Sequence, residues 1–290
     1  MIEVKGIKKQ FGKKLVLNDI NLKIQNGKCT AFIGKNGAGK STLIDIIIGN
    51  LTPNEGQIID KSELLDPSKM AILFQKTQFP KMIKVKELFY LHHALYPQAM
   101  SLKAFKALTL FDDAQLNQMA NKLSGGQQRL LDFALALVGH PQLLILDEPT
   151  AAMDIETREY FWQVIQHLKD QGTTILYTSH YIEEVERMAD HIVLLKNGVI
   201  QMNDTLSQIR QQDAMTFIYI PKKYQKQLHI NEKIQETKQQ HIIKICTKDV
   251  SRTLQDLQQQ QVNLNEIEIH KSSLLEIMFK DNHSKEVETL

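Results

Sequence analysis

Hydrophobic and polar residues alternate over residues 1–25, with an interruption at Phe11 and Gly12. This alternation predicts a β-hairpin or meander at the start of the chain. Short apolar runs follow, each of a length that suits a strand. They cover residues 29–33, 57–59, 71–75, 142–146 and 173–179. The run 142–146 is apolar from Leu143 onward, which is typical of a strand buried on both faces of a sheet.

Between these runs, apolar residues recur at three- and four-residue spacing, which predicts helices. The helices extend from residue 42 to Gly49, from Ser124 through Leu137, and over 156–169 and 182–189. Residues 85–119 predict a helical region that Pro97 interrupts. Residues 191–195 and 199–202 predict a hairpin. This order of strands and helices indicates an α/β fold.

The last 80 residues have a different composition, rich in Gln and Lys. Their pattern predicts strands at 215–220, 233–236, 241–246 and 265–269, and helices at 250–259 and 272–279. The run from Gln258 to Gln261 is expected at a solvated helix end. These elements predict a small C-terminal α+β appendage, with a ferredoxin-like arrangement as the preferred topology.

The totals fit a globular chain of two domains, because 290 residues exceed the usual length of one. There are 35 basic and 33 acidic residues, so no global charge indicates a nucleic-acid partner. Cys29 and Cys246 lack metal-type spacing and suit a reducing cytoplasm, with Cys29 expected to be a small buried hydrophobe. The start resembles no signal peptide, and no apolar stretch reaches the ~18 residues that a membrane span requires.

The segment between the first buried run and its helix fits the pattern Gly, four residues, then Gly-Lys-Ser/Thr. It comprises Gly34, Lys35, Asn36, Gly37, Ala38, Gly39, Lys40, Ser41 and Thr42. Its glycines let successive N–H groups point into one concavity, and the helix N-terminus adds partial positive charge. We therefore expect a triphosphate site, with Lys40 at the β- and γ-phosphates and Ser41 on Mg²⁺.

Polar residues follow the other predicted strands. Asp147 and Glu148 come directly after the buried run 142–146, at the strand end where open parallel sheets bind ligands. Asp147 is a candidate to hold Mg²⁺ through the water shell of the ion. Glu148 is a candidate to polarise the water that attacks the γ-phosphate. Acidic residues at strand ends are also often simple turn formers.

Three further candidates have weaker individual signals. Gln75 stands at the end of the strand 71–75, where its amide could contact a metal-bound water. His180 ends the strand 173–179 and could donate a hydrogen bond to the γ-phosphate or orient the attacking water; a structural histidine is the alternative. Phe11 is a candidate platform for an adenine base, or a core aromatic.

A second anion-binding helix start is predicted at Ser124, Gly125, Gly126 and Gln127, where Ser124 can cap the helix and the glycines expose backbone N–H groups. A simple capped turn would have the same pattern. Asp154 is a candidate cap for the helix at 156–169 and a candidate contact across a subunit interface.

In this order, these residues closely resemble the nucleotide-binding subunit of ATP-binding cassette (ABC) transporters. The loop 34–42 resembles the family's phosphate loop, Gln75 its glutamine loop, and Leu123 to Gln127 its signature. Residues Leu143 to Glu148 resemble the family's acidic strand, Ala151 to Asp154 its crossing loop, and His180 its switch histidine. Phe11 corresponds to the aromatic that stacks on adenine.

The resemblance implies a P-loop NTPase cassette with a mixed β-sheet core over residues 1–210. It also implies a helical signature subdomain at about 79–138 and an accessory domain over 211–290. It implies a dimer with a second copy or a related paralogue, in which each ATP lies between one phosphate loop and the partner's Ser124-Gly125-Gly126, Gln127 and Asp154. ATP and Mg²⁺ are the expected cofactors, with Mg²⁺ at Ser41, Gln75 and Asp147. Glu148, His180 and Gln75 are the expected catalytic residues.

A separate transmembrane permease is the expected partner, which would place the chain in the cytoplasm at the inner face of the membrane. Residues 271–279 and 189–192 resemble cassettes of bacterial exporters of drugs, antimicrobial peptides and lipids, so the resemblance favours export over import. The alternative is a soluble cassette ATPase without a transport role. An ATP-bound scaffold without turnover would be expected to lack Glu148 or His180, and both are present.

The chain departs from the commonest family pattern at three positions. Lys35 stands where proline is frequent, Ala152 where glycine or leucine is frequent, and Leu130 where an arginine often follows the signature. None of these residues is an expected catalytic group, so we expect ATP hydrolysis to be retained.

Overall fold

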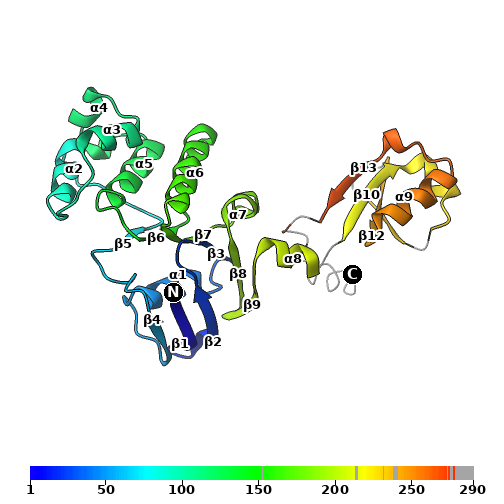
Figure 1. Ribbon diagram of the computed structural model, residues 1–290, viewed down its shortest axis with the longest axis horizontal. Coiled ribbons are helices and arrows are strands. Elements are labelled where there is room, and N and C mark those ends of the chain that lie inside the picture. Colours follow the sequence, from blue (N-terminus) through cyan, green and yellow to red (C-terminus); the bar gives the residue numbers. More distant parts are fainter. Residues whose placement is uncertain are drawn as a thin grey trace. The chain divides into compact units, whose positions relative to one another are not determined.

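The structure of the chain is a computed structural model that describes residues 1–151, 153–212, 215–230, 232–237, 241–272, 274 and 277. The chain divides into two compact units, Met1–Thr205 and Leu206–Leu290. Figure 1 labels the helices and strands of both units. Ala152 and most of the helix predicted at 272–279 lie outside the described residues.

The central sheet of the first unit has the strand order β5-β6-β7-β3-β8-β9. The strands are β3 (Cys29–Ile33), β5 (Met70–Leu73), β6 (Leu143–Asp147), β7 (Thr174–Thr178), β8 (His191–Lys196) and β9 (Val199–Asp204). All neighbours pair in parallel except β8 and β9, which form the predicted antiparallel hairpin. The mixed sheet that the family resemblance implies is therefore confirmed. Every residue of β3 and β7 is buried.

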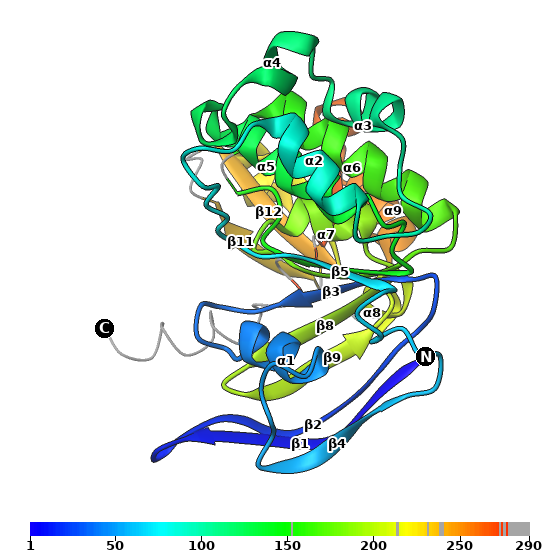
Figure 2. The same ribbon diagram turned by 90° about the vertical axis from the view of Figure 1, so that its left-hand side faces the viewer.

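A second, antiparallel sheet has the order β2-β1-β4, with β1 (Ile2–Phe11), β2 (Lys14–Ile24) and β4 (Glu55–Asp60). The turn between β1 and β2 lies at Gly12, as predicted. Helix α1 (Lys40–Ile47) shares one hydrophobic core with this sheet and with strands of the central sheet, and Figure 2 shows it between the two sheets. Because α1 follows β3, its start lies at the carboxyl end of that interior strand of the central sheet.

A helical layer with its own core lies on the side of the central sheet where β5 is the outermost strand (Figure 2). It consists of α2 (Val85–His93), α3 (Leu102–Thr109), α4 (Asp113–Asn117) and α5 (Gly125–Ala136). The predicted interruption at Pro97 is confirmed, since it lies between α2 and α3. Phe89 and Phe105 pack in this core with ring centroids 4.8 Å apart. Helices α6 (Ile155–Asp170) and α7 (Ile182–Met188) complete the unit.

The second unit begins with α8 (Leu206–Gln212), followed by the antiparallel sheet β11-β12-β10-β13. Its elements are β10 (Thr216–Pro221), the 3₁₀ segment η2 (Lys222–Gln227), β11 (Lys233–Glu236), β12 (Ile242–Thr247), α9 (Val250–Gln259) and β13 (Glu268–Lys271). Leu257 of α9 packs on Ile218 and Ile245 in a separate core. The order is that of a ferredoxin-like sheet in which η2 occupies the place of the first helix.

Two details of this unit differ from the sequence prediction. The strand expected at 265–269 is wrong at its start: Leu264–Glu266 form a 3₁₀ turn, and β13 begins only at Glu268. The Asn263 side chain stabilises that turn by accepting a hydrogen bond from the backbone N–H of Asn265. Helix α8 was not predicted.

Among the residues that the structure describes, no helix has both the length and the apolar character required to cross a bilayer.

Candidate active site

The glycine-rich loop follows the carboxyl end of β3, an interior strand of the central sheet, and enters α1 through Gly39. Gly39 is the N-cap residue of α1 with φ +107°, a left-handed conformation that favours glycine. A Cβ there would lie 2.6 Å from Cδ2 of Leu17. Gly37 also has a positive φ, +81°, but a Cβ on it would meet nothing within 4 Å. The loop is thus tight against β2 on one side and open on the other.

Lys40 lies in the first turn of α1 with only 7% of its surface exposed. Its Nζ donates hydrogen bonds to the carbonyl oxygens of Gly34, at 2.7 Å, and Lys35, at 3.4 Å. Burial lowers the pKa of the Lys40 ammonium, and the nearby carboxylates of Glu148 and Asp147 act in the opposite direction. A partly desolvated cation held in this way suits an anionic ligand.

Strand β6 ends at Asp147, next to Thr178 at the end of β7. The Thr178 hydroxyl donates to Asp147 Oδ1 at 2.6 Å and accepts the backbone N–H of Glu148 at 2.9 Å. The Ser41 hydroxyl lies 3.5 Å from the other Asp147 oxygen. Hydroxyl and carboxylate oxygens are the donors that Mg²⁺ prefers, so this pair fits that cation.

The Glu148 carboxylate lies beside two other residues that the sequence indicated, Gln75 and His180. Gln75 Nε2 donates to Glu148 Oε2 at 3.1 Å, and His180 Nδ1 lies 3.5 Å from the same oxygen. Glu148 itself has φ +45°, a left-handed conformation that is uncommon outside glycine. The fold thus holds three polar side chains from three separate segments together at a strained turn.

A cavity of about 540 Å³ joins these groups. It is lined by Phe11, Lys14, Val16, Asn36, Gly37, Gly39, Lys40, Ser41, Thr42, Gln75, Asp147 and Glu148. Its volume suits a small-molecule ligand. Phe11 stands at its rim, 48% exposed, with Lys9 Nζ 5.2 Å from its ring centroid. Lys14 and Val16, which the sequence analysis did not select, belong to the lining because β2 pairs with β1 beside Phe11.

Nine predicted residues are not among those that line this cavity. Four of them belong to the phosphate loop or adjoin Glu148, namely Gly34, Lys35, Ala38 and His180. The other five lie at two helix starts, namely Ser124, Gly125, Gly126, Gln127 and Asp154. Ser124 and Gln127 form a reciprocal capping box at the start of α5, with hydrogen bonds of 3.3 and 3.0 Å. Asp154 accepts the Thr157 N–H at 2.8 Å and caps α6. The predictions that Ser124 and Asp154 cap these helices are confirmed. A Cβ on Gly125 would meet nothing within 4 Å, so this helix start is open.

Arg129 is a site residue that the sequence analysis missed. Only 6% exposed, it donates from Nε to the Pro149 carbonyl at 2.8 Å and from Nη2 to the carbonyls of Asp147 and Glu148 at 3.2 and 3.3 Å. Its Nη1 donates to the carbonyl of Phe74, directly before Gln75. In the sequence, the only signal for Arg129 was a basic residue at the start of the apolar stripe of the helix after Ser124. Leu130, the departure noted above, is simply buried.

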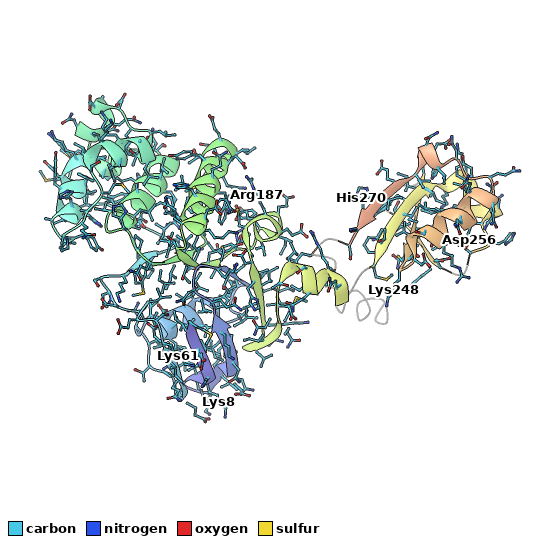
Figure 3. The ribbon with its side chains drawn as sticks, in the orientation of Figure 1. Lys8, Lys61, Arg187, Lys248, Asp256 and His270 are labelled. Atoms are coloured by element: carbon cyan, nitrogen blue, oxygen red, sulfur yellow. The ribbon has the colours of Figure 1, made fainter. Side chains whose placement is uncertain are left out.

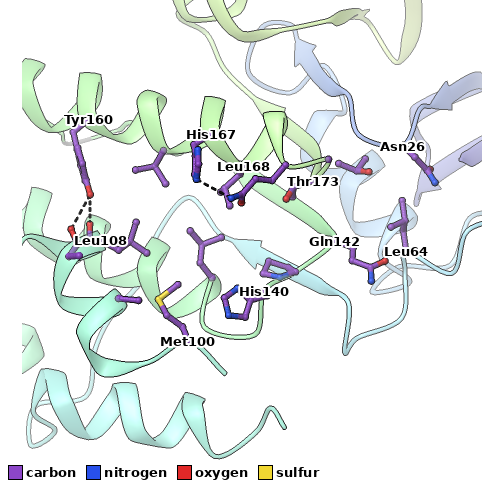
Figure 4. A pocket seen from close by; sticks show the side chains of 18 residues that line it. Asn26, Leu64, Met100, Leu108, His140, Gln142, Tyr160, His167, Leu168 and Thr173 are labelled. Atoms are coloured by element: carbon purple, nitrogen blue, oxygen red, sulfur yellow. Dashed lines mark hydrogen bonds between the residues drawn. The ribbon is translucent and has the colours of Figure 1, made fainter. Parts of the chain in front are cut away.

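A larger cavity, of about 790 Å³, lies elsewhere in the first unit (Figure 4). It is bordered by α3, α6 and the loop around His140, and the Tyr160 hydroxyl at its edge donates to the Leu108 carbonyl at 2.9 Å. No predicted site residue lines it. Within the described residues there is also no group of three or more His, Cys, Asp or Glu suited to hold a metal ion. The chemistry is therefore concentrated at the smaller cavity.

A phosphate loop between a buried strand and a helix, with an Asp-Glu pair ending a neighbouring strand, defines a P-loop nucleoside triphosphatase. A sequence profile described as "ABC transporter" matches residues 17–151. The Nod factor export ATP-binding protein I of Bradyrhizobium diazoefficiens is 32% identical over 207 residues, 68% of each chain. An aliphatic sulfonates import ATP-binding protein of Pseudomonas savastanoi pv. phaseolicola is 35% identical over 205 residues, 70% of this chain and 75% of the other.

Solved structures give the same result. A dimeric bacterial ABC transporter cassette superposes with a TM-score of 0.62 at 27% identity, covering 71% of this chain and 99% of the other. The same cassette in a post-hydrolysis state bound to ADP and Pi has a TM-score of 0.62 at 26% identity, with the same coverage. The chain therefore belongs to the ATP-binding subunits of the ABC transporter family, and it is an ATP hydrolase of that type.

Proposed function

We propose that this chain powers export of a drug, peptide or lipid through a separate membrane permease by ATP-driven closure of a cassette dimer. Several relatives with similar sequences bear the name Nod factor export ATP-binding protein, which supports export. An importer subunit is equally similar in sequence, so direction rests on the exporter-like segments 189–192 and 271–279 as well. We further propose that residues 1–210 are the cassette and 211–290 an accessory domain.

The observation that carries the proposal is the convergence on Glu148. In the proposed mechanism, the Glu148 carboxylate accepts a proton from the water that attacks the γ-phosphate. Gln75 and His180, both within 3.5 Å of Glu148 Oε2, orient that water and contact the γ-phosphate. Lys40 stabilises charge on the β- and γ-phosphates. ATP bound in the 540 Å³ cavity would stack its base on Phe11.

Ser41 and Asp147 would hold Mg²⁺, with Gln75 reaching one of its waters. When bound, the cation neutralises negative charge on the phosphate oxygens. The distance of 3.5 Å between the Ser41 hydroxyl and Asp147 Oδ2 supports this assignment. Thr178 contributes by holding the other Asp147 oxygen, which fixes the orientation of the carboxylate.

A second cassette, a copy of this chain or a paralogue, completes the site in the proposal. The capped, open helix start at Ser124-Gly125-Gly126 and Gln127 presents backbone N–H groups outside its own cavity, which suits the phosphates of a partner's ATP. Asp154 lies at the start of another helix and is proposed to contact the partner. The dimer reported for the related bacterial cassette is consistent with this arrangement.

The permease is proposed to dock on the segment from Phe74 to Leu95, at the inner, cytoplasmic face of the membrane. This segment exposes five large hydrophobic side chains: Phe74 (50%), Met82 (88%), Tyr90 (54%), Leu91 (56%) and Leu95 (67%). Exposed apolar side chains gathered in one segment are typical of a protein interface. Because Phe74 directly precedes Gln75, movement of this surface is connected to the catalytic cavity.

The test is a pair of measurements on Glu148→Gln and the unaltered chain. The variant keeps the size of the side chain but loses the proton acceptor. We expect it to bind ATP and dimerise with ATP while phosphate release falls at least about a hundredfold. Normal phosphate release by Glu148→Gln would refute the assignment of the base.

Purification from host membranes should recover a polytopic partner; a soluble partner would favour the non-transport alternative.

A further inference from the structure

Glu184 is a buried carboxylate close to the active site that the proposed mechanism does not use. It lies in the first turn of α7, only 7% exposed. Its Oε1 accepts a hydrogen bond from the Thr150 hydroxyl at 2.8 Å, and its Oε2 accepts one from the Ser179 hydroxyl at 3.1 Å. Both hydroxyl-bearing residues are themselves 2% exposed. The network is therefore shielded from competing water.

The two hydroxyls belong to the segments that carry the catalytic groups. Thr150 follows Glu148 by two residues, and Ser179 immediately precedes His180. The Ser179 oxygen also accepts the backbone N–H of Tyr181 at 2.9 Å, which fixes the chain on the other side of His180. A single carboxylate thus ties together the two turns that set the distance between Glu148 and His180.

Arg158 connects the same carboxylate to the start of α6. Its Nε lies 3.7 Å from Glu184 Oε1, its Nη2 donates to the Met153 carbonyl at 3.5 Å, and its guanidinium carbon lies 4.8 Å from the Tyr181 ring centroid. The Nε is buried and has no hydrogen-bond partner. Because a buried unpaired donor is unfavourable, a small approach of Arg158 toward Glu184 would be stabilising.

We propose that Glu184 is a positioning residue for ATP hydrolysis, which aligns Glu148 with His180 and links both to the turn at Met153 and Asp154 through Arg158. This inference rests on the proposed function, in which Asp154 contacts the second cassette. A carboxylate only accepts hydrogen bonds, so it makes both hydroxyls donors. An amide in the same place would donate to one of them and would leave Arg158 without its negative partner.

The test compares Glu184→Gln with Glu183→Gln in the full-length chain. Glu183 is the preceding residue of the same helix and is exposed, so it is a matched control for the loss of one negative charge. We expect Glu184→Gln to lower kcat for ATP by about tenfold or more and to leave KM within about twofold, because Glu184 does not line the ATP cavity. Glu183→Gln should match the unaltered chain.

Two variants that each remove one of the hydroxyl hydrogen bonds to Glu184 separate an effect on positioning from an effect on folding. Ser179→Ala and Thr150→Val each remove one hydroxyl and should each lower kcat by about threefold or more with unchanged KM. Each should still unfold cooperatively, at a temperature lowered by about 2–4 °C, because one buried carboxylate oxygen loses its donor. If the unaltered chain hydrolyses ATP and Glu184→Gln has the same kcat as Glu183→Gln, this inference is overturned and the proposed function stands. Normal kcat in both Ser179→Ala and Thr150→Val would have the same consequence. An unaltered chain without ATP turnover would overturn the proposed function and this inference with it.

Discussion

Arg129 shows how one buried charge can join distant segments. Its guanidinium binds backbone carbonyls before the glutamine residue and after strand β6, and its Nη1 lies 3.6 Å from Asp132. Burial lowers the pKa of Arg129 and raises that of Asp132, the cost of holding both groups away from water. Asp132 also accepts a hydrogen bond from Thr77, so α5 is attached to the glutamine loop at two points.

We predict that Arg129→Met destabilises the chain by about 2–4 kcal/mol, because it leaves several buried carbonyls and the Asp132 carboxylate without a partner. The matched control is Arg187→Met. Arg187, labelled in Figure 3, makes two 2.6 Å hydrogen bonds to Glu159, but its side chain is 51% exposed. An exposed pair contributes at most about 1 kcal/mol. Urea unfolding measures both losses, and equal losses would contradict the prediction.

The β2-β1-β4 sheet has its own charged cluster around Glu3 of β1. The Glu3 carboxylate is 5% exposed and pairs with Lys61 at 2.8 Å and Lys5 at 3.0 Å. Hydrogen bonds from Lys61 and then Lys5 lower its pKa from 4.5 to about 2, against the opposing effect of burial. A carboxylate with a depressed pKa in the folded state stabilises the fold above its unfolded pKa.

We therefore predict that the contribution of Glu3 is complete above about pH 5 and is lost as the pH falls from about 4.5 toward 2. Glu3→Gln should be less stable than the unaltered chain at pH 7, and the difference should shrink at pH 3. Urea midpoints at the two pH values measure this. A difference that stays constant with pH would show that the charge of Glu3 is irrelevant to folding.

The elements that the sequence predicted well are those whose signal is local. The glycine-rich loop, the run Leu143–Asp147 and the Ser124 cap each depend on residues within one short segment, so periodicity and capping rules apply directly. The start of β13 was mispredicted because Asn263 stabilises a 3₁₀ turn that the alternation of apolar residues does not reveal. Helix α8 has only seven residues, too few for a clear periodic signal.

The parts of the site that escaped prediction depend on contacts between distant segments. Arg129 binds carbonyls about twenty residues ahead and 55 residues behind it, and carbonyls have no side-chain signature. Glu184 meets Thr150 across 34 residues. Lys14 and Val16 enter the cavity through the register of β1 with β2. Only the fold brings these groups to the residues that the motifs identified.

The two units of the chain differ in what they contribute to the site. Every residue that lines the 540 Å³ cavity lies between Phe11 and Glu148, within Met1–Thr205. Among the described residues, the first unit has hydrophobic cores of its own, including one around Ile7 and Ile46 and one around Phe89 and Leu131, and the second unit has a separate one around Ile218 and Leu257. A unit with its own core can fold without the rest of the chain. ATP binding and the α+β appendage should therefore be separable.

We predict that a fragment of residues 1–205 folds and binds ATP with a Kd within about threefold of the full chain. The binding groups are all retained, so only indirect effects of the missing unit remain. Calorimetry with ATP and Mg²⁺ measures both constants. Lys40→Met in the fragment is the control, since it removes the cation that faces the phosphates and should weaken binding at least about tenfold. A folded fragment that fails to bind ATP, beside a full chain that binds it, would show that residues 206–290 shape the nucleotide site. An unfolded fragment would instead show that the first unit depends on the second for stability, and either result would exclude a merely appended domain.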